Sequence, residues 1–183
     1  VTFDKVIQDI YLEMIDQIAS VGKNINIEGI ISIGGGSVID TGKAVSIALG
    51  MDIPASFVVG MNHLDGERLP HIVIPTTAGT GSEVTNVAVL FNEKIKQKVM
   101  IFDAIVFPDL AILDPCLTTS LSPTLTVQGA FDALTHAIEA YVSTKANAAT
   151  EALSLQSIAL IFDNLEKVLH YGNNLAYRMH LLT

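Results

Sequence analysis

A short apolar run that ends in three glycines and leads into a helical pattern constrains the fold more than any other feature of the sequence. Residues 27–33 are mostly isoleucine, Gly34–Gly36 follow, and residues 37–49 carry apolar side chains at helical spacing. A short apolar run bounded by glycine predicts a buried strand, and glycines allow a tight turn into the next element. This order of strand, turn and helix is typical of α/β proteins with a parallel sheet.

Short strands and loops continue from here to residue 113. The pattern predicts a helix at 3–21, a loop at 51–69, and strands at 71–75, 84–91, 98–102 and 110–113. Segments rich in glycine, proline and small polar residues separate these elements.

After Pro123 the periodicity is helical only. Helices are predicted at 124–142, at 148–169 and from 175 to the end. We therefore expect two domains, an α/β domain over residues 1–117 and the start of an all-α domain over residues 118–183. Because both ends of the chain fall inside helical patterns, we also expect a middle piece of a longer protein.

The composition excludes several classes of protein. The formal net charge of −9 argues against nucleic acids and anionic membranes as partners, because these bind patches of Lys and Arg. The apolar runs are shorter than the roughly 18 residues that a membrane helix needs. Cys116 is the single cysteine, so a disulfide framework is excluded and a reducing, cytoplasmic setting is expected.

Two loops of small residues follow two of the predicted strands. The loop at 34–37 leads into a helix, whose N-terminal N–H groups attract phosphate, and the loop at 76–83 carries Thr and Ser hydroxyls. In a parallel sheet both would open at the carboxyl ends of the strands, where ligands bind. Each has an alternative: a tight turn capped by Ser37 in a capping-box pattern with Asp40, and a mobile polar loop. The first loop lacks the dinucleotide spacing G-x-G-x-x-G, because its sixth position is Ile39.

Asp132 and His136 lie four residues apart in an apolar helical pattern, so both side chains leave the same face of the helix. A carboxylate oxygen and an imidazole nitrogen in this register can reach one divalent ion, and Zn²⁺ and Fe²⁺ accept that mixed ligand set. The alternative is an ordinary contact between neighbouring turns of a helix.

The remaining candidate residues have simpler interpretations. Lys98 would help bind phosphate or ribose, or is a solvated lysine. Cys116 lacks the neighbours of a nucleophile and is interpreted as a small apolar residue. The histidines without a partner at ligand spacing are interpreted as surface or hydrogen-bonded core residues, namely His63, His71, His170 and His180.

Taken together, these stretches resemble the iron-containing (group III) alcohol dehydrogenases. The matching motifs are GGGSVIDTGK at residues 34–43, PTTAGTGSEVT at 75–85 and DALTHAIEAYVS at 132–143. The resemblance covers essentially the whole chain. It implies a dehydroquinate synthase-like fold, in which an incomplete Rossmann-like nucleotide-binding domain precedes an α-helical metal-binding domain and the active site lies between them. It also implies a metal-dependent oxidoreductase that transfers a hydride between NAD or NADP and a small primary alcohol or aldehyde.

The resemblance also assigns roles to residues. It implies that Gly35, Gly36 and Ser37 hold the cofactor pyrophosphate. The residues it places along the ribose and nicotinamide are Thr76, Thr77, Thr80, Thr85, Val87 and Lys98, with Leu117 more peripheral. It makes Asp132 and His136 two of the four ligands of Fe²⁺, with Zn²⁺ as an alternative metal. The other two ligands would be histidines beyond Thr183, and no side chain is given a direct catalytic role.

Three further expectations follow. A polyol dehydrogenase of the glycerol type, which shares the fold and the glycine triplet, stays open as an alternative, although its metal motif differs. A nucleotide-binding fragment without catalytic activity also stays open, because only half of the metal site falls in this chain. Helices cut off from their neighbours would expose apolar faces, so we expect a homo-oligomer.

Overall fold

The computed structural model of the chain describes residues 1–8 and 10–183. Their contacts divide them into two compact units, each considered by itself: residues 1–75 with 82–112, and residues 76–81 with 113–183. Strands and helices alternate in the first unit, and helices dominate the second. This confirms the predicted fold class, an α/β region with a parallel sheet followed by an all-α region.

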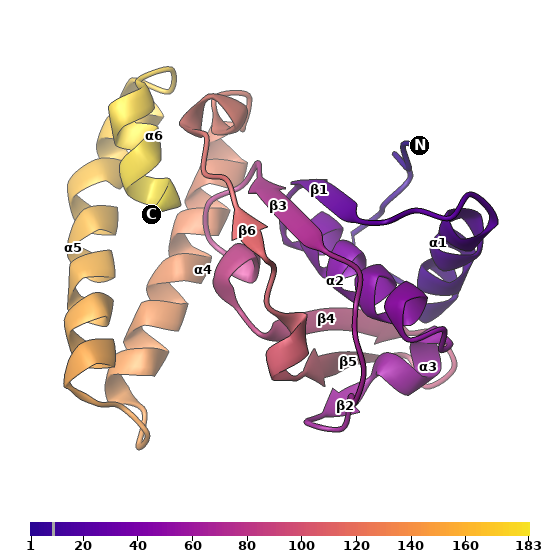
Figure 1. Ribbon diagram of the computed structural model, residues 1–183. Coiled ribbons are helices and arrows are strands. Elements are labelled where there is room, and N and C mark those ends of the chain that lie inside the picture. Colours follow the sequence, from indigo (N-terminus) through magenta and orange to yellow (C-terminus); the bar gives the residue numbers. More distant parts are fainter. Residues whose placement is uncertain (9) are drawn as a thin grey trace. The chain divides into compact units, whose positions relative to one another are not determined.

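A three-stranded parallel sheet forms one layer of the α/β unit. It consists of β1 (Ile30–Gly34), β3 (His71–Pro75) and β6 (Leu110–Ala111) in the order β1-β3-β6, as Figure 1 shows. The register pairs Gly34 with Pro75. Both long strands therefore end at the same edge of the sheet, as parallel strands in register do.

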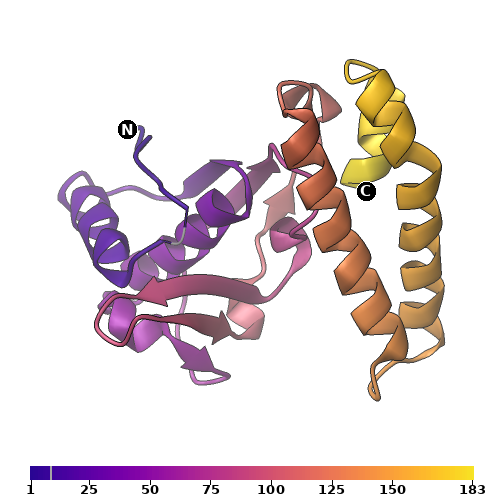
Figure 2. The ribbon, with the colours of Figure 1, turned by 180° about the vertical axis from the view of Figure 1, so that it is seen from behind.

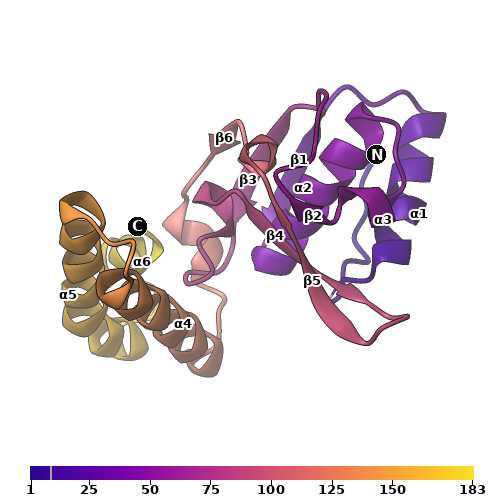
Figure 3. The same ribbon diagram turned by 90° about the horizontal axis from the view of Figure 1, so that it is seen from below.

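A second sheet is built on a hairpin. Its strands are β2 (Gly60–Met61), β4 (Val87–Asn92) and β5 (Gln97–Phe102), in the order β2-β5-β4. The antiparallel pair of β4 and β5 is seen along its length in Figure 3. β4 is thus the outer strand of this sheet.

Helix α2 (Gly36–Gly50) is the central element of the α/β unit. It packs against β1, β3 and β4, and so contacts both sheets, while α1 (Leu12–Asn24) and α3 (Ala55–Val58) pack against it. Every residue from Ile39 to Ala48 is buried. A helix surrounded on all sides needs no polar face, which explains its apolar composition. The main core cluster joins α1, α2, α3 and the hairpin.

The helical unit consists of α4 (Pro123–Val142), α5 (Ala148–His170) and α6 (Leu175–Leu182), seen in orange to yellow in Figure 2. Side chains just before each helix accept hydrogen bonds from its first N–H groups, and these caps are Ser122, Asn147 and Asn174. α4 packs along α5, and α5 along α6. In the described part of the chain, none of the helices combines the length and apolar character that crossing a bilayer requires.

Large apolar side chains are exposed on all three helices of this unit. The most exposed are Phe162 at 71%, Val142 at 70% and Leu153 at 64%. The expected exposure of apolar faces after Pro123 is therefore confirmed.

Several predicted elements differ from the structure. The first helix begins at Leu12 and not near residue 3, because Ile10 extends beside β4 and its carbonyl accepts the Phe91 N–H at 2.7 Å. The predicted loop at 51–69 contains α3 and β2. The strand predicted from residue 84 begins at Val87, after a 3₁₀ turn at Ser82–Val84. Two further 3₁₀ turns occur, at Ala104–Val106 and Pro115–Thr118.

The prediction that the first strand is buried is only half correct. Ser32 and Gly34 are buried, whereas Ile31 and Ile33 on the other face are 65% and 58% exposed. Within the described residues of this unit, the second face of β1 has no covering layer. An apolar run alone does not show whether one or both faces are covered.

A buried histidine joins the sheet to α2. The His71 Nε2 lies 2.8 Å from the Ser32 Oγ, and a Cβ atom added at Gly42 would lie only 2.5 Å from that nitrogen. Burial, followed by the charges of Arg68 and Lys43, lowers the pKa of His71 to about 4, while Asp109 acts in the opposite direction. The prediction of a hydrogen-bonded core histidine is confirmed at this position.

The pKa of His71 predicts an acid-dependent loss of stability. Because the unfolded chain binds a proton near pH 6.5 and the folded chain only near pH 4, the stabilisation is complete above pH 6.5 and is lost as the pH falls towards 4. We expect a loss of roughly 3 kcal/mol from this residue, which urea unfolding at pH 7 and pH 4.5 would measure against a His71→Gln variant. The exposed His170→Gln is the control. An equal change in the free energy of unfolding between pH 7 and pH 4.5 in wild type and in His71→Gln would contradict the prediction.

Candidate functional site

The glycine loop has the geometry of an anion site at a helix start. Gly35 is the N-cap of α2, with φ −78° and ψ −174°, and Gly36 is the first helical residue. No side chain of the described residues caps this end. The first N–H groups of α2 therefore have no side-chain cap within the described part of the chain, and uncapped N–H groups at a helix start are the kind that can bind a phosphate.

The predicted capping role of Ser37 is wrong. Ser37 lies inside the first turn of α2, and its carbonyl accepts a hydrogen bond from the Thr41 Oγ1 at 2.7 Å. Asp40 turns away from the helix start and accepts the Val89 N–H at 2.9 Å. The cap position falls on Gly35, two residues earlier than predicted, because β1 runs on to Gly34 and the helix begins at Gly36.

The threonine loop, residues 76–81, belongs to the helical unit. Thr76 and Thr77 are half-buried and Thr80 is exposed. Two glycines bring this loop against α4: a Cβ at Gly79, where φ is +149°, would lie 2.4 Å from the Gly129 carbonyl oxygen, and a Cβ at Gly129 would lie 2.0 Å from that of Ala78. The loop therefore contacts the backbone of the helix that carries Asp132 and His136.

Thr85 and Val87 lie at the entrance of β4, and Lys98 lies on β5. Lys98 is the second residue of this strand, which begins one residue before the predicted start. The register pairs Val87 with Phe102 and Phe91 with Lys98, so Val87 and Lys98 share a face of the hairpin. They are four positions apart, which is roughly 13 Å along the strands. The structure thus brings Thr85 and Val87 together, with Lys98 further along the same face.

Leu117 lies in the 3₁₀ turn at Pro115–Thr118 of the helical unit and is 36% exposed. The side chain of Asp114 begins this turn by accepting the Cys116 N–H at 2.9 Å. Cys116 itself is exposed. Its hydrogen bond with Asp114 raises the pKa of the thiol.

Asp132 and His136 lie on α4 with their side chains on one face. The Asp132 Oδ1 and His136 Nε2 are 3.9 Å apart, and the two side chains are 48% and 55% exposed. Two ligands about 2.1 Å from one tetrahedral ion lie roughly 3.4 Å apart, so a side-chain movement of about half an ångström would let this pair share Fe²⁺ or Zn²⁺. No third His, Cys, Asp or Glu joins them among the described residues.

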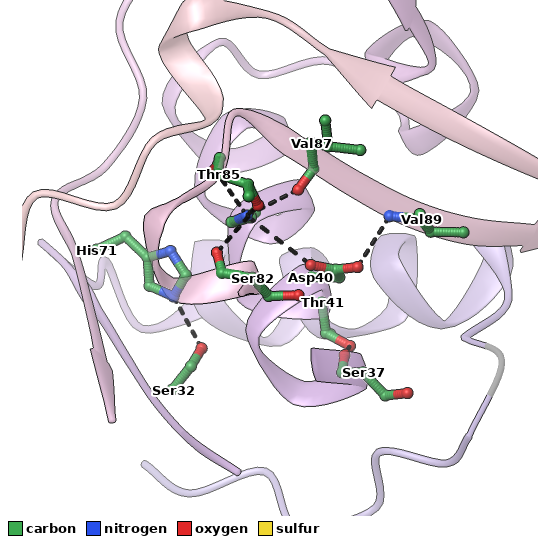
Figure 4. A network of polar contacts seen from close by, with 10 residues as sticks. Ser32, Ser37, Asp40, Thr41, His71, Ser82, Thr85, Val87 and Val89 are labelled. Atoms are coloured by element: carbon green, nitrogen blue, oxygen red, sulfur yellow. Dashed lines mark hydrogen bonds and ion pairs between the residues drawn. The ribbon is translucent and has the colours of Figure 1, made fainter. Parts of the chain in front are cut away.

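A buried polar network beneath Thr85 and Val87 was not predicted. Figure 4 shows Asp40 beside these two residues. The Lys43 Nζ donates to the Thr85 and Val87 carbonyls at 2.9 and 2.7 Å and contacts the Thr85 Oγ1 at 3.3 Å. Lys43 is 1% exposed and Asp40 is 7% exposed. The sequence offered one signal for this network, because Asp40 and Lys43 are charged residues three positions apart in an otherwise apolar helical pattern.

Burial dominates the electrostatics of this network. It lowers the pKa of Lys43 to about 8, although the charges of Asp40 and Glu83 oppose the shift. It also raises the pKa values of the Asp40 and Glu83 carboxyls, against the effect of the Lys43 ammonium. Each group is therefore held in surroundings that disfavour its charge unless its partners stay in place.

Comparison with protein families identifies the chain. A model described as "Iron-containing alcohol dehydrogenase" matches residues 1–115, and one described as "Fe-containing alcohol dehydrogenase family, C-terminal" matches residues 126–183. The chain belongs to the iron-containing alcohol dehydrogenase family.

Individual relatives agree with this assignment. The chain is 43% identical over 157 residues to the probable alcohol dehydrogenase EutG of Escherichia coli strain K12, and 40% identical over 152 residues to the 1,3-propanediol dehydrogenase of Citrobacter freundii. The matches cover 85% and 83% of this chain but only 39% of each relative. The chain therefore spans about two fifths of the length of these proteins.

The matches to solved structures agree with this family assignment. The chain matches a 1,3-propanediol oxidoreductase with a TM-score of 0.95 and 35% identity, and the alcohol dehydrogenase from Oenococcus oeni with 0.96 and 31%. Each match covers all of this chain and 48% of the other. A sulfoacetaldehyde reductase from Bifidobacterium kashiwanohense, solved with NAD⁺, matches with 0.93 and 31% over 98% of this chain and 48% of its own.

Proposed function

We propose that the protein is a metal-dependent oxidoreductase that transfers a hydride between a nicotinamide nucleotide and a small primary alcohol or aldehyde. One observation carries the proposal. The Asp132–His136 pair lies on the same helix against which the threonine loop is packed through Gly79 and Gly129. A pair suited to a divalent ion and a loop suited to a ribose thus belong to one compact unit.

The residues of the chain bind and orient the reactants. The first N–H groups of α2, at Gly36 and Ser37 beyond the N-cap Gly35, would hold the pyrophosphate. The groups proposed to line the ribose and nicotinamide are those of Thr76, Thr77, Thr80, Thr85, Val87 and Lys98, with Leu117 at the periphery. Asp132 and His136 would hold the metal ion. A bound Fe²⁺ would supply Lewis acidity at the substrate oxygen, and the nicotinamide would supply or accept the hydride.

The details of this proposal follow from the same residues and from the relatives. We propose residues 1–117 as the nucleotide-binding domain and 118–183 as the start of the metal-binding domain. NAD is favoured over NADP because a matching reductase was solved with NAD⁺, and Fe²⁺ over Zn²⁺ because of the family. The exposed apolar side chains of the helical unit favour a homo-oligomer. A single exposed cysteine is typical of the reducing cytoplasm.

One alternative substrate class has support. Two proteins that match this chain are named for 1,3-propanediol, so a short diol is the second candidate. A nucleotide-binding role without catalysis is the third, because the described residues hold half of a metal site.

The test is an assay of the complete protein with its metal controlled. Protein loaded anaerobically with Fe²⁺ is expected to oxidise NADH with short aldehydes, and the same protein treated with a chelator is expected to lose this activity. Calorimetry with NADH, with and without Fe²⁺, separates binding from turnover. NADH binding without metal-dependent turnover would favour the non-catalytic alternative, and no NADH binding would refute the proposal.

A further inference from the structure

Along the outer edge of β4 and just before it, four alternate residues each have a backbone group bound outside their own sheet. Even-numbered residues of this strand point towards β5, so residues 87, 89 and 91, and residue 85 before the strand, point outwards. Lys43 holds the carbonyls of residues 85 and 87, Asp40 accepts the N–H of Val89, and the Ile10 carbonyl accepts the N–H of Phe91. Side chains of α2 thus take the place of a neighbouring strand along half of this edge.

The Lys43 ammonium has as many N–H donors as there are oxygen acceptors around it. It has three N–H groups, and two carbonyls and one hydroxyl lie within 3.3 Å of the nitrogen. Asp40, 3.9 Å away, and Glu83 supply the nearby negative charge. A methionine would fill the same space without the cost of burying a charge, but would leave the two partly buried carbonyls without this donor.

The same helix begins at the glycine loop. Lys43 lies seven residues after Gly36, or about 10 Å further along the axis of α2. One rigid helix therefore carries the proposed pyrophosphate site at its start and holds the entrance of β4 further along. Because Lys43 binds backbone atoms of Thr85 and Val87, it fixes where these two residues lie relative to the start of α2.

We propose that Lys43 is a positioning residue for the nicotinamide nucleotide: its ammonium holds Thr85 and Val87 at the place where they contact the cofactor bound at the start of α2. This inference rests on the proposed function. It assigns Lys43 no contact with substrate or metal.

The test compares Lys43→Met with Lys23→Met in the complete Fe²⁺-loaded protein. Lys23 is an exposed lysine of the same unit, paired with Asp52 at 2.5 Å, and serves as the matched control. NADH affinity is measured by fluorescence titration, and the KM for NADH, the KM for aldehyde and the kcat by steady-state kinetics. Lys43→Met is expected to weaken NADH binding about tenfold, equivalent to about 1.4 kcal/mol, with the KM for aldehyde unchanged. Lys23→Met is expected to match wild type.

A purely structural role would lower the melting temperature and the fraction of active protein without separating the two KM values. If Lys43→Met folds poorly because Asp40 has lost its counter-charge, the double variant Asp40→Asn/Lys43→Met restores neutrality and is expected to show the same loss of NADH affinity. Hydrogen exchange of the amides at residues 85–89 reports directly on the segment that Lys43 holds. We expect this exchange to accelerate in both variants.

The outcomes distinguish the two levels of the proposal. Wild-type protein that binds NADH, together with a Lys43→Met variant of equal affinity, would overturn the positioning role and leave the proposed function intact. The same holds if the amides exchange faster but NADH affinity does not change. Wild-type protein that fails to bind NADH would refute the proposed function and this inference with it.

Discussion

Replacing His136 by alanine is expected to abolish Fe²⁺-dependent turnover, by at least about a thousandfold. Removal of one ligand leaves Asp132 alone on that face of α4, and a single exposed carboxylate holds a divalent ion weakly. Lewis acidity contributes several kcal/mol of barrier lowering, and each 1.36 kcal/mol is a factor of ten in rate. The measurement is kcat/KM for aldehyde reduction, with bound iron quantified in the same samples.

The control for this substitution is His170→Ala, because His170 is also an exposed helical histidine of the same unit and its Nδ1 contacts the Glu166 carbonyl. It is expected to keep both iron and activity. Asp132→Asn should resemble His136→Ala, with NADH affinity retained in each. Full turnover and full iron content in His136→Ala would show that the pair is only a contact between neighbouring turns of the helix.

Gly129→Ala is expected to displace the threonine loop from α4. Alanine is ordinarily the better helix residue, by about 1 kcal/mol. Here its Cβ would lie 2.0 Å from the Ala78 carbonyl oxygen, and no side-chain rotation can relieve a clash with backbone. We expect a net loss of about 2 kcal/mol in the free energy of unfolding, by the usual cost of overpacking. We also expect a rise of at least about tenfold in the KM for NADH.

Gly172→Ala is the matched control. A Cβ at Gly172 would meet its nearest neighbours at 3.5 and 3.6 Å, which is ordinary contact, so this variant is expected to match wild type in both measurements. Urea unfolding gives the stability and steady-state kinetics the KM. Equal stability and equal KM in Gly129→Ala would mean that the loop does not rest on the helix.

Local sequence patterns predicted the elements whose burial is simple. The helices after Pro123 show clear periodicity and begin at side-chain caps, and their predicted ranges agree closely with α4, α5 and α6. The strand at residues 71–75 was predicted to the residue. Asp132 and His136 could be proposed as a pair because their i,i+4 spacing is short-range and follows helical geometry, whereas Gly35 and Gly36 were named through the family resemblance.

Tertiary contacts explain what the sequence did not reveal. Val6, Ile7 and Ile10 have helical spacing, yet Ile10 is buried by extending beside β4, and only the folded hairpin creates that position. The partners of Lys43 are backbone carbonyls about forty residues away in the chain, which no local pattern encodes. The contact between Gly79 and Gly129 depends likewise on two segments that meet only after folding.

The covered edge of β4 has a consequence for how the molecule meets other chains. An outer strand with free N–H and C=O groups can add a strand from another molecule, which is a common first step towards fibrils. Along this edge, the carbonyls of residues 85 and 87 bind Lys43, the N–H of residue 89 binds Asp40 and the N–H of residue 91 binds Ile10. A foreign strand would have to displace a buried ammonium and a buried carboxylate together, so β4 is protected from growth into an intermolecular sheet.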